Sequence, residues 1–299
     1  MMPGGLAAFV CAALCTAVGF CGLRAAGAAP TAESRAFFAK PLTLGAHRGG
    51  RVLWPENTLV AFTQAATRWP DVLLEGDLQV TADGHVVLLH DWTVDRTTDG
   101  TGRIVGKTLA EVRALDAGCR FTPDRGKTFP YRGKGIGIPT LAEVLDALPN
   151  ARFLFEMKGA AGIADATVRI IQQANAVERV ALASFNSWAM QRVRELAPRI
   201  ICCYDINTGL GMVKALRGAH WNAYQPAAGI LALDDDAIRG FALTPDDFRA
   251  IRSKGIAVLI HTINDRREMR SYLDTGVDSI LTDRPDVLAE VLAKAPRAR

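Results

Sequence analysis

The sequence predicts an α/β fold in which a parallel sheet closes into a barrel covered by helices. From Pro41 onward, short apolar and β-branched runs alternate with amphipathic helical stretches almost to the end of the 299 residues. Such alternation is typical of a parallel sheet with helices packed on it. Eight runs qualify as strands, and eight parallel strands can close into a barrel. A doubly wound open sheet is the structural alternative.

The expected strands and helices follow one another in a regular order. The strands cover residues 43–46, 73–80, 153–157, 180–184, 200–204, 221–225, 257–261 and 279–281. The helices, which carry an apolar stripe at helical spacing, cover residues 59–68, 141–148, 163–174, 187–196, 245–254, 266–274 and 285–293. Capping boxes pair Thr140 with Glu143 and Thr108 with Glu111.

The segment 85–138 interrupts this alternation. It begins with a short strand that ends at His90, and a stretch rich in Gly, Thr and Arg follows, with one brief helix over 109–115. We expect residues 91–138 to form a small insertion over one end of a barrel that spans residues 41–295.

Residues 1–29 have the features of a secretory signal peptide. They contain no acidic residue and a single basic one, Arg24, and an apolar run over 6–23 precedes small residues over 25–29. We therefore expect a periplasmic or secreted protein. An uncleaved membrane anchor is the alternative, because the apolar run is long enough to cross a bilayer.

Charge and cysteine content argue against several classes of protein. The formal net charge is +4 and the basic residues are spread along the chain, which argues against a nucleic-acid binder. Only Cys119, Cys202 and Cys203 follow the leader, so the fold does not depend on a disulfide framework and no paired zinc-ligand spacing occurs. The expected partners are small molecules.

Two carboxylates lie in a strand that is otherwise mostly apolar. Glu75 and Asp77 are two residues apart, so both side chains should point to the same face, which looks inward in a barrel. At roughly 7 Å along the strand, two dry carboxylates repel each other and call for a cation between them. Oxygen ligands suit Mg²⁺ or Ca²⁺, and Glu156 at the end of another apolar strand can complete the site. A solvated acidic face is the alternative.

Basic and imidazole side chains follow the same strands. His47 and Arg48 come directly after the first strand, at the end where barrel enzymes carry their sites, and Lys158 lies two residues beyond Glu156. Arg48 and Lys158 suit a phosphate group. His90 supplies a second imidazole, and cleavage of a phosphodiester needs both a general base and a general acid. Structural histidines and a Glu156–Lys158 salt bridge are the alternatives.

Taken together, these motifs resemble the glycerophosphodiester phosphodiesterase family in order and spacing. The matching motifs are His47-Arg48-Gly49, Pro55-Glu56-Asn57-Thr58, Glu75-x-Asp77, Thr81-x-Asp83-Gly84, His90-Asp91, Phe155-Glu156-x-Lys158 and Leu281-Thr282-Asp283-Arg284-Pro285-Asp286. The resemblance covers essentially the whole chain after the leader. It implies a TIM (β/α)8 barrel with a small insertion after the second barrel strand.

The resemblance also implies a reaction and a role for each matching residue. The reaction is metal-dependent hydrolysis of a glycerophosphodiester to glycerol 3-phosphate and an alcohol, through attack by the substrate's own glycerol hydroxyl and a cyclic phosphate. The implied roles are metal ligands for Glu75, Asp77 and Glu156, acid and base for His47 and His90, phosphate contacts for Arg48 and Lys158, and shaping of the first loop for Glu56 and Asn57.

One motif departs from the family pattern. The seventh strand usually ends in Trp-Thr-x-Asn, whereas this chain reads His261-Thr262-Ile263-Asn264. His261 is either a tolerated replacement at the rim or a polar contact that alters the choice of substrate. Alternative functions are a lysophospholipase D or sphingomyelinase D type activity on the same barrel, in which the lipid substrate brings membrane contact, and an inactive phosphate-binding envelope module.

Overall fold

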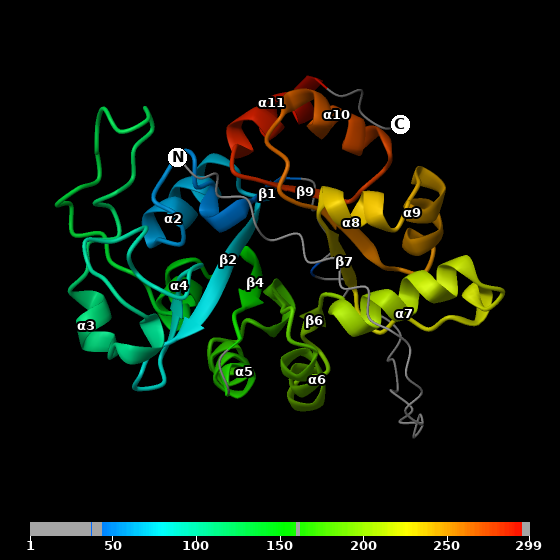
Figure 1. The fold of residues 1–299 in the computed structure, drawn as a ribbon, viewed down its shortest axis with the longest axis horizontal. Coiled ribbons are helices and arrows are strands. Elements are labelled where there is room, and N and C mark those ends of the chain that lie inside the picture. The colour runs from blue at the N-terminus through cyan, green and yellow to red at the C-terminus, as the bar shows by residue number, and fades with distance from the viewer. Residues whose placement is uncertain (1–36, 38–43, 160–161, 295–299) are drawn as a thin grey trace, which may run out of the picture.

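The computed structural model describes residue 37 and residues 44–159 and 162–294. Within these residues, eight parallel strands form a nearly closed barrel covered by helices (Figure 1). The strands are hydrogen-bonded in the order β6-β5-β4-β2-β1-β9-β8-β7, and a bridge between Cys203 and Ile230 brings the two ends of this path together. The barrel prediction is confirmed, and the open doubly wound sheet is wrong.

The strands agree with the sequence prediction at seven of eight places. They are β1 (Leu44–Ala46), β2 (Leu73–Val80), β4 (Arg152–Met157), β5 (Val180–Ala183), β6 (Ile201–Cys202), β7 (Ile230–Leu233), β8 (Ala257–Ile260) and β9 (Ser279–Thr282), with the short antiparallel β3 (Val86–Leu88) beside β2.

The helices cover the outside of the barrel. They are α2 (Leu59–Arg68), α3 (Leu109–Arg113), α4 (Leu141–Ala147), α5 (Ile163–Gln173), α6 (Ser187–Leu196), α7 (Ile206–Arg217), α8 (Asp235–Gly240), α9 (Pro245–Arg252), α10 (Arg266–Asp274) and α11 (Pro285–Lys294). Short 3-10 turns are η1 (His47–Gly49), η2 (Ile104–Gly106), η3 (Val177–Arg179) and η4 (Trp221–Ala223). The capping boxes at Thr108 and Thr140 are both present.

The strand predicted at 221–225 is wrong, and β7 takes its place in the barrel. Trp221 and Tyr224 stack on each other with ring centroids 5.2 Å apart, at the 3-10 turn η4. Their apolar faces therefore pack against each other outside the sheet. The run Ile230–Leu233 is almost wholly buried, as expected for a strand covered on both faces.

Helices α7 and α8 were not predicted from the sequence. Helix α7 contains Gly209 and Gly211, which lower helix propensity. A capping box between Asp205 and Thr208 fixes its start instead. Helix α8 is a single short segment that begins at the cap Asp234.

The barrel interior is apolar below the site. Leu73 of β2 and Leu154 of β4 are buried in one interior cluster, and each precedes an acidic residue on the same face of its strand by two positions. The register pairs Asp77 with Glu156. The carboxylates therefore lie at the carboxyl end of the barrel, where its loops gather.

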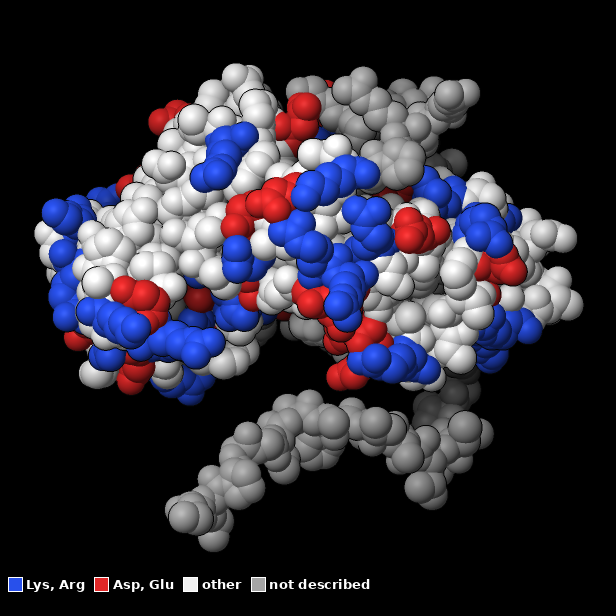
Figure 2. All heavy atoms as spheres, turned by 90° about the horizontal axis from the view of Figure 1, so that it is seen from above, with Lys and Arg blue, Asp and Glu red and all other residues white. Residues whose placement is uncertain are grey.

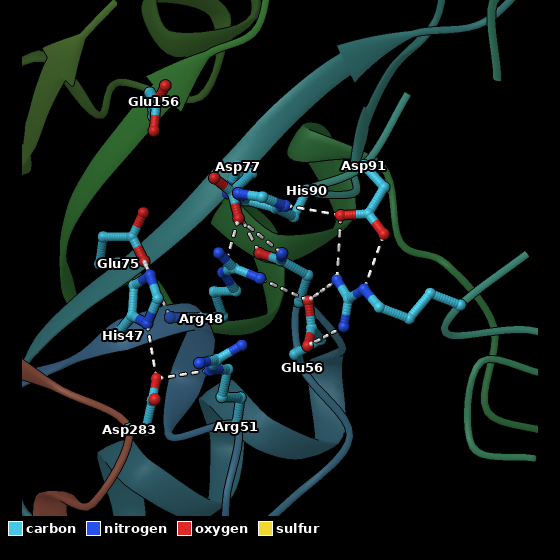
Figure 3. A network of polar contacts seen from close by, with 12 residues as sticks. His47, Arg48, Arg51, Glu56, Glu75, Asp77, His90, Asp91, Glu156 and Asp283 are labelled. Carbon is cyan, nitrogen blue, oxygen red and sulfur yellow. Dashed lines mark hydrogen bonds and ion pairs between the residues drawn. The ribbon is translucent and has the colours of Figure 1, made fainter. Parts of the chain in front are cut away.

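The predicted insertion forms a small unit with its own core. Val87, Val94, Ile104, Val112 and Ile138 are buried together beside the barrel. The unit follows β3 and contains α3, close to the predicted helix at 109–115. It carries His90 and Asp91 to the mouth of the barrel (Figure 3).

Basic and acidic side chains are interspersed over the face of the molecule drawn in Figure 2. In the part of the chain that the structure describes, no helix is both long enough and apolar enough to cross a membrane. The predicted signal peptide, residues 1–29, lies outside the described residues, as do residues 41–43 and 295 of the predicted barrel domain.

Candidate active site

Strand β2 presents Glu75 and Asp77 to the barrel interior as two almost wholly buried carboxylates, which are 5% and 1% exposed. Gly76 between them faces the opposite way. A Cβ atom there would lie 3.0 Å from Phe62 of α2 and 3.1 Å from the side-chain oxygen of Asn57. Glycine therefore lets the loop before α2 approach the strand that carries the carboxylates.

Asp77 is surrounded by donors from three segments of the chain. Its Oδ2 accepts a hydrogen bond of 2.9 Å from Asn57 Nδ2 and lies 3.3 Å from Arg48 Nε. Its Oδ1 lies 3.1 Å from Lys158 Nζ, which is also 2.7 Å from Glu156 Oε2. An ammonium group therefore lies between Asp77 and Glu156 in this structure.

The buried charges shift one another's pKa values. Burial and the neighbouring Asp77 raise the pKa of Glu75 well above its usual range. Burial also acts to raise the pKa of Asp77, but Lys158 and Arg48 outweigh it and lower the pKa. Burial acts to lower the pKa of Lys158, and its two carboxylate partners outweigh it and raise the pKa. The cations therefore keep Asp77 ionised, whereas burial favours the protonated form of Glu75.

Each predicted catalytic histidine is held by a carboxylate at Nδ1 (Figure 3). His47 Nδ1 lies 2.6 Å from Asp283 Oδ1, and His90 Nδ1 lies 2.7 Å from Asp91 Oδ1. A carboxylate at Nδ1 favours the tautomer with the proton there and leaves Nε2 as the acceptor. His47 Nε2 lies 3.9 Å from Glu75 Oε2, at the buried end of the site.

Each of these carboxylates is in turn held by an arginine. Arg51 Nε donates to Asp283 over 2.7 Å, and Arg96 Nε donates to Asp91 over 2.6 Å. Burial opposes ionisation of Asp283, but hydrogen bonds from His47 and Arg51 hold its pKa well below the usual range. Arg96 likewise outweighs burial and lowers the pKa of Asp91 to about 2.

Asp283, Asp91, Arg51 and Arg96 were not assigned a role from the sequence. Asp283 and Asp91 both stand inside motifs that match the family, directly after Thr282 and His90. Their place inside these motifs was the sequence signal that could have identified them as functional residues. The pairing of Asp283 with His47 could not be read from them, because 236 positions separate the two residues.

Arg48 is buried at the centre of a chain of charges. Its backbone lies in the left-handed region with φ 52°, which few residues other than glycine adopt, and its backbone N–H donates to Glu75 Oε2 over 2.8 Å. Its guanidinium donates to Glu56 over 3.0 Å, and Arg96 donates to both oxygens of Glu56. Glu56 therefore links the first barrel loop to the insertion and positions Arg48.

A cavity of about 260 Å³ opens beside these residues. His47, Glu75, Glu156 and His261 line one wall of it. Burial, and to a smaller extent the nearby His47, lowers the pKa of His261 to about 4, while Asp234 acts in the opposite direction. His261 is therefore neutral at physiological pH and offers the cavity a neutral imidazole at the position where the family pattern usually has tryptophan.

Acid should destabilise the barrel through His261. The unfolded chain takes up a proton near pH 6.5, whereas folded His261 does so only near 4. Stability is therefore lost as the pH falls through 6.5, by about 2 kcal/mol at pH 5. The free energy of unfolding should be measured by denaturant unfolding at about pH 7 and pH 5. In His261→Asn this part of its decline should be absent. His220→Asn, at an exposed position, is the control; an unchanged decline in His261→Asn contradicts the assignment.

The donor set suits a divalent cation, although the side chains do not converge on one point. Among residues 37, 44–159 and 162–294, no three His, Cys, Asp or Glu side chains lie close enough together to hold a metal ion. Glu75, Asp77 and Glu156 nevertheless offer only carboxylate oxygens, which hard divalent ions prefer. Lys158 Nζ already places one positive charge between Asp77 and Glu156. These three residues fit the ion in chemistry and charge.

Comparisons with known proteins identify the family to which the chain belongs. The model of the glycerophosphoryl diester phosphodiesterase family matches residues 47–287. A glycerophosphodiester phosphodiesterase of Caldanaerobacter subterraneus is 32% identical over 257 residues, which cover 83% of this chain and 97% of the relative. One from Bacillus subtilis is 29% identical and covers 82% and 85%. The crystal structure of an Agrobacterium tumefaciens glycerophosphodiester phosphodiesterase is 26% identical, with a TM-score of 0.67 over 83% of this chain and 99% of that one.

Proposed function

Because the chain belongs to the glycerophosphoryl diester phosphodiesterase family, we propose that its barrel hydrolyses glycerophosphodiesters to glycerol 3-phosphate and an alcohol, with His47 and His90 as the acid–base pair and a divalent ion as cofactor. The chain is an enzyme, a phosphoric diester hydrolase. The observation that carries the acid–base assignment is the pair of imidazoles, each oriented by its own buried or half-buried aspartate beside Glu75 and Asp77.

The acid–base steps use the free Nε2 atoms of the two histidines. One imidazole takes the proton of the substrate's glycerol hydroxyl while the hydroxyl oxygen bonds to phosphorus. The other imidazole gives a proton to the departing alcohol oxygen as its bond to phosphorus breaks. Water then opens the cyclic phosphate with the two roles exchanged. Each aspartate keeps its imidazole in one orientation throughout both steps.

The charged side chains around the histidines bind and orient the phosphate. Arg48 and Lys158 both pair with Asp77. A phosphate bound by these two cations would therefore lie next to an ion held by Asp77. Glu75, Asp77 and Glu156 would hold the ion. When bound, a Mg²⁺ or Ca²⁺ ion supplies positive charge against the negative charge that develops on the phosphoryl oxygens.

Purified protein incubated with glycerophosphoethanolamine or glycerophosphocholine tests the proposal. We expect glycerol 3-phosphate, followed by a coupled assay, in the presence of Mg²⁺ or Ca²⁺ and none after treatment with a chelator. Addition of the ion back to the chelated sample should restore the rate. Absence of metal-dependent product from both substrates would refute the proposed function.

Glu75→Gln should raise the ion concentration needed for half-maximal activity roughly tenfold or more, because one charged ligand is lost. The fold should be retained, since glutamine resembles the protonated carboxyl that burial favours at this position. Glu195→Gln, on the exposed surface of α6, is the matched control. The activity of both variants should be measured as a function of metal concentration. Identical curves would show that Glu75 is not a metal ligand.

We also propose that residues 1–29 direct export to the periplasm or the exterior, on the sequence features given above. Mass spectrometry of the mature protein after expression with its leader should find an N-terminus near Ala29. An intact leader in the membrane fraction would favour the anchor instead.

A further inference from the structure

His90, one of the two proposed acid–base residues, stands where the chain leaves the sheet. Strand β3 pairs antiparallel with β2 and leads toward the site. Just after β3, the backbone N–H of Leu89 donates to the carbonyl oxygen of Asp77 over 2.9 Å. His90 and Asp91 follow in a bend outside the strands. The pairing of the two strands therefore ends before His90 and does not by itself fix its position.

The side chain of Gln79 reaches this bend from β2. Gln79 is completely buried, and its Nε2 donates to the carbonyl oxygen of Asp91 over 3.1 Å and, more weakly, to that of His90 over 3.4 Å. Carbonyl oxygens only accept hydrogen bonds, so the residue that holds them must be a donor. An amide meets this need without placing a further charge beside the buried carboxylates. Gln79 therefore holds the two peptide groups that follow His90.

Gln79 stands on the same face of β2 as two of the proposed metal ligands. Glu75, Asp77 and Gln79 follow one another at intervals of two residues within the strand, so their side chains leave it on one side. Figure 3 shows His90 between Asp77 and Asp91. One strand thus carries two carboxylates directly and reaches the histidine through the amide of Gln79. The distance between the proposed ion site and His90 is therefore set by a single rigid element.

The ion pairs of Asp91 hold His90 less firmly than this buried contact. The side chain of Asp91 is 29% exposed and that of its partner Arg96 45% exposed. Exposed ion pairs are screened by water and contribute little to holding a geometry. The amide of Gln79 is shielded from water and bonds to the backbone from which the imidazole of His90 projects. It is therefore the better candidate for fixing the place of the ring, whereas Asp91 fixes its rotation.

The other end of the same amide argues against a purely structural role. Among the residues that the structure describes, the buried Oε1 atom of Gln79 has no hydrogen-bond partner. A buried acceptor without a partner costs about 1–3 kcal/mol of stability. An apolar side chain of similar length would avoid this cost and fill the same space. What glutamine adds at this position is therefore its donor to the bend at His90.

We propose that Gln79 is a positioning residue that acts through His90. Its Nε2 holds the bend after His90 against β2 and so keeps the imidazole at a fixed distance from Asp77. This inference rests on the proposed function and adds to it a residue that touches neither the substrate nor the ion. Loss of the donor should let the ring move by a fraction of an ångström to an ångström, which is enough to slow a proton transfer.

Gln79→Met removes the donor and keeps the length of the side chain. With glycerophosphoethanolamine, kcat should fall roughly 10- to 100-fold, while KM and the ion concentration for half-maximal activity stay within about twofold of wild type. The melting temperature should stay within about 4 °C. Gln191→Met, which removes an exposed amide bonded to Glu195, is the matched control and should change none of these values.

Three results would overturn the inference. A kcat within twofold of wild type would show that the contact is not needed. A raised ion requirement would place Gln79 in the support of the ion site. A Gln79→Met protein that does not fold would show that the barrel itself depends on the amide.

A double-mutant cycle tests whether Gln79 acts through His90. In the His90→Ala background, Gln79→Met should change the remaining kcat less than twofold, because no imidazole is left to position. A fall by the same factor in both backgrounds would overturn the inference, since Gln79 would then act by another route.

Nuclear magnetic resonance of protein labelled with 15N-histidine gives a readout that does not depend on turnover. The ring signals of His90 are identified by their absence from His90→Ala, and those of His47 by their absence from His47→Ala. In Gln79→Met the 15N shifts of His90 should move toward a mixture of tautomers, because the ring is less well aligned with Asp91. Those of His47 should stay unchanged. Unchanged His90 signals would overturn the inference. Shifted His90 signals in a protein that hydrolyses no glycerophosphodiester would support the contact and refute only the proposed function.

Discussion

His47→Ala should lower kcat for glycerophosphoethanolamine by roughly 100- to 10,000-fold, the usual value of a general acid or base. The imidazole lies at the cavity wall with its Nδ1 fixed by Asp283, so no other side chain can replace its Nε2. The barrel should stay folded, because His47 stands in the turn η1 and outside the apolar clusters. Steady-state kinetics and thermal melting measure the two effects, with His220→Ala at an exposed position as the control. A rate within threefold of wild type would remove His47 from the reaction.

The same variant can assign the two roles when it is compared with His90→Ala. A substrate with a p-nitrophenol leaving group needs little help from a general acid, because the phenolate leaves without a proton. The variant that lacks the general acid should regain most of its activity on that substrate. The variant that lacks the base should stay slow on both substrates.

Asp283→Asn should lower kcat by up to roughly 10,000-fold with little change in KM, as happens when the aspartate that orients a catalytic histidine is replaced by asparagine. Asparagine keeps the shape of the aspartate, but its amide cannot hold the proton on His47 Nδ1 in the same way. Asp283 is 2% exposed and also accepts from Arg51 and Asn264, so its carboxylate is fixed on several sides. The reaction should therefore lose the orientation of His47 and not the binding of the substrate.

The control for Asp283→Asn is Asp165→Asn, which breaks the surface ion pair with Arg192. Its kcat and melting temperature should match wild type, since exposed ion pairs contribute little. Asp91→Asn should have a smaller effect than Asp283→Asn, because Asp91 is more exposed and His90 has more contact with water. A rise in KM with unchanged kcat in Asp283→Asn would contradict a positioning role.

The barrel could be predicted because its strands are apolar on both faces and stand in a regular alternation with helices. The paired carboxylates on β2 were predicted to share one face, and Gly76 facing α2 confirms this. The seventh strand was missed because Trp221 and Tyr224 resemble strand residues, whereas they stack on each other outside the sheet. Local pattern cannot distinguish these two uses of an aromatic pair.

Contacts between distant segments could not be predicted in the same way. The histidines could be identified from the sequence, but not the partner of His47, which is Asp283, directly after the last barrel strand β9. The apolar side of the cavity could not be predicted either. Phe185, Leu210 and Phe241 line it from three separate segments, and each alone is an ordinary exposed residue. Such features become visible only when the barrel brings its loops together.

The chain of charges from Arg48 through Glu56 and Arg96 to Asp91 joins two parts of the molecule that have separate apolar cores. Segments with their own small cores can open independently of the rest of a protein. Opening of the insertion would take His90 and Asp91 away from the barrel while β1, β2 and β4 stayed paired. On gentle heating we therefore expect a reversible loss of activity that arises in the insertion, while the barrel keeps Glu75, Asp77 and Glu156 in place.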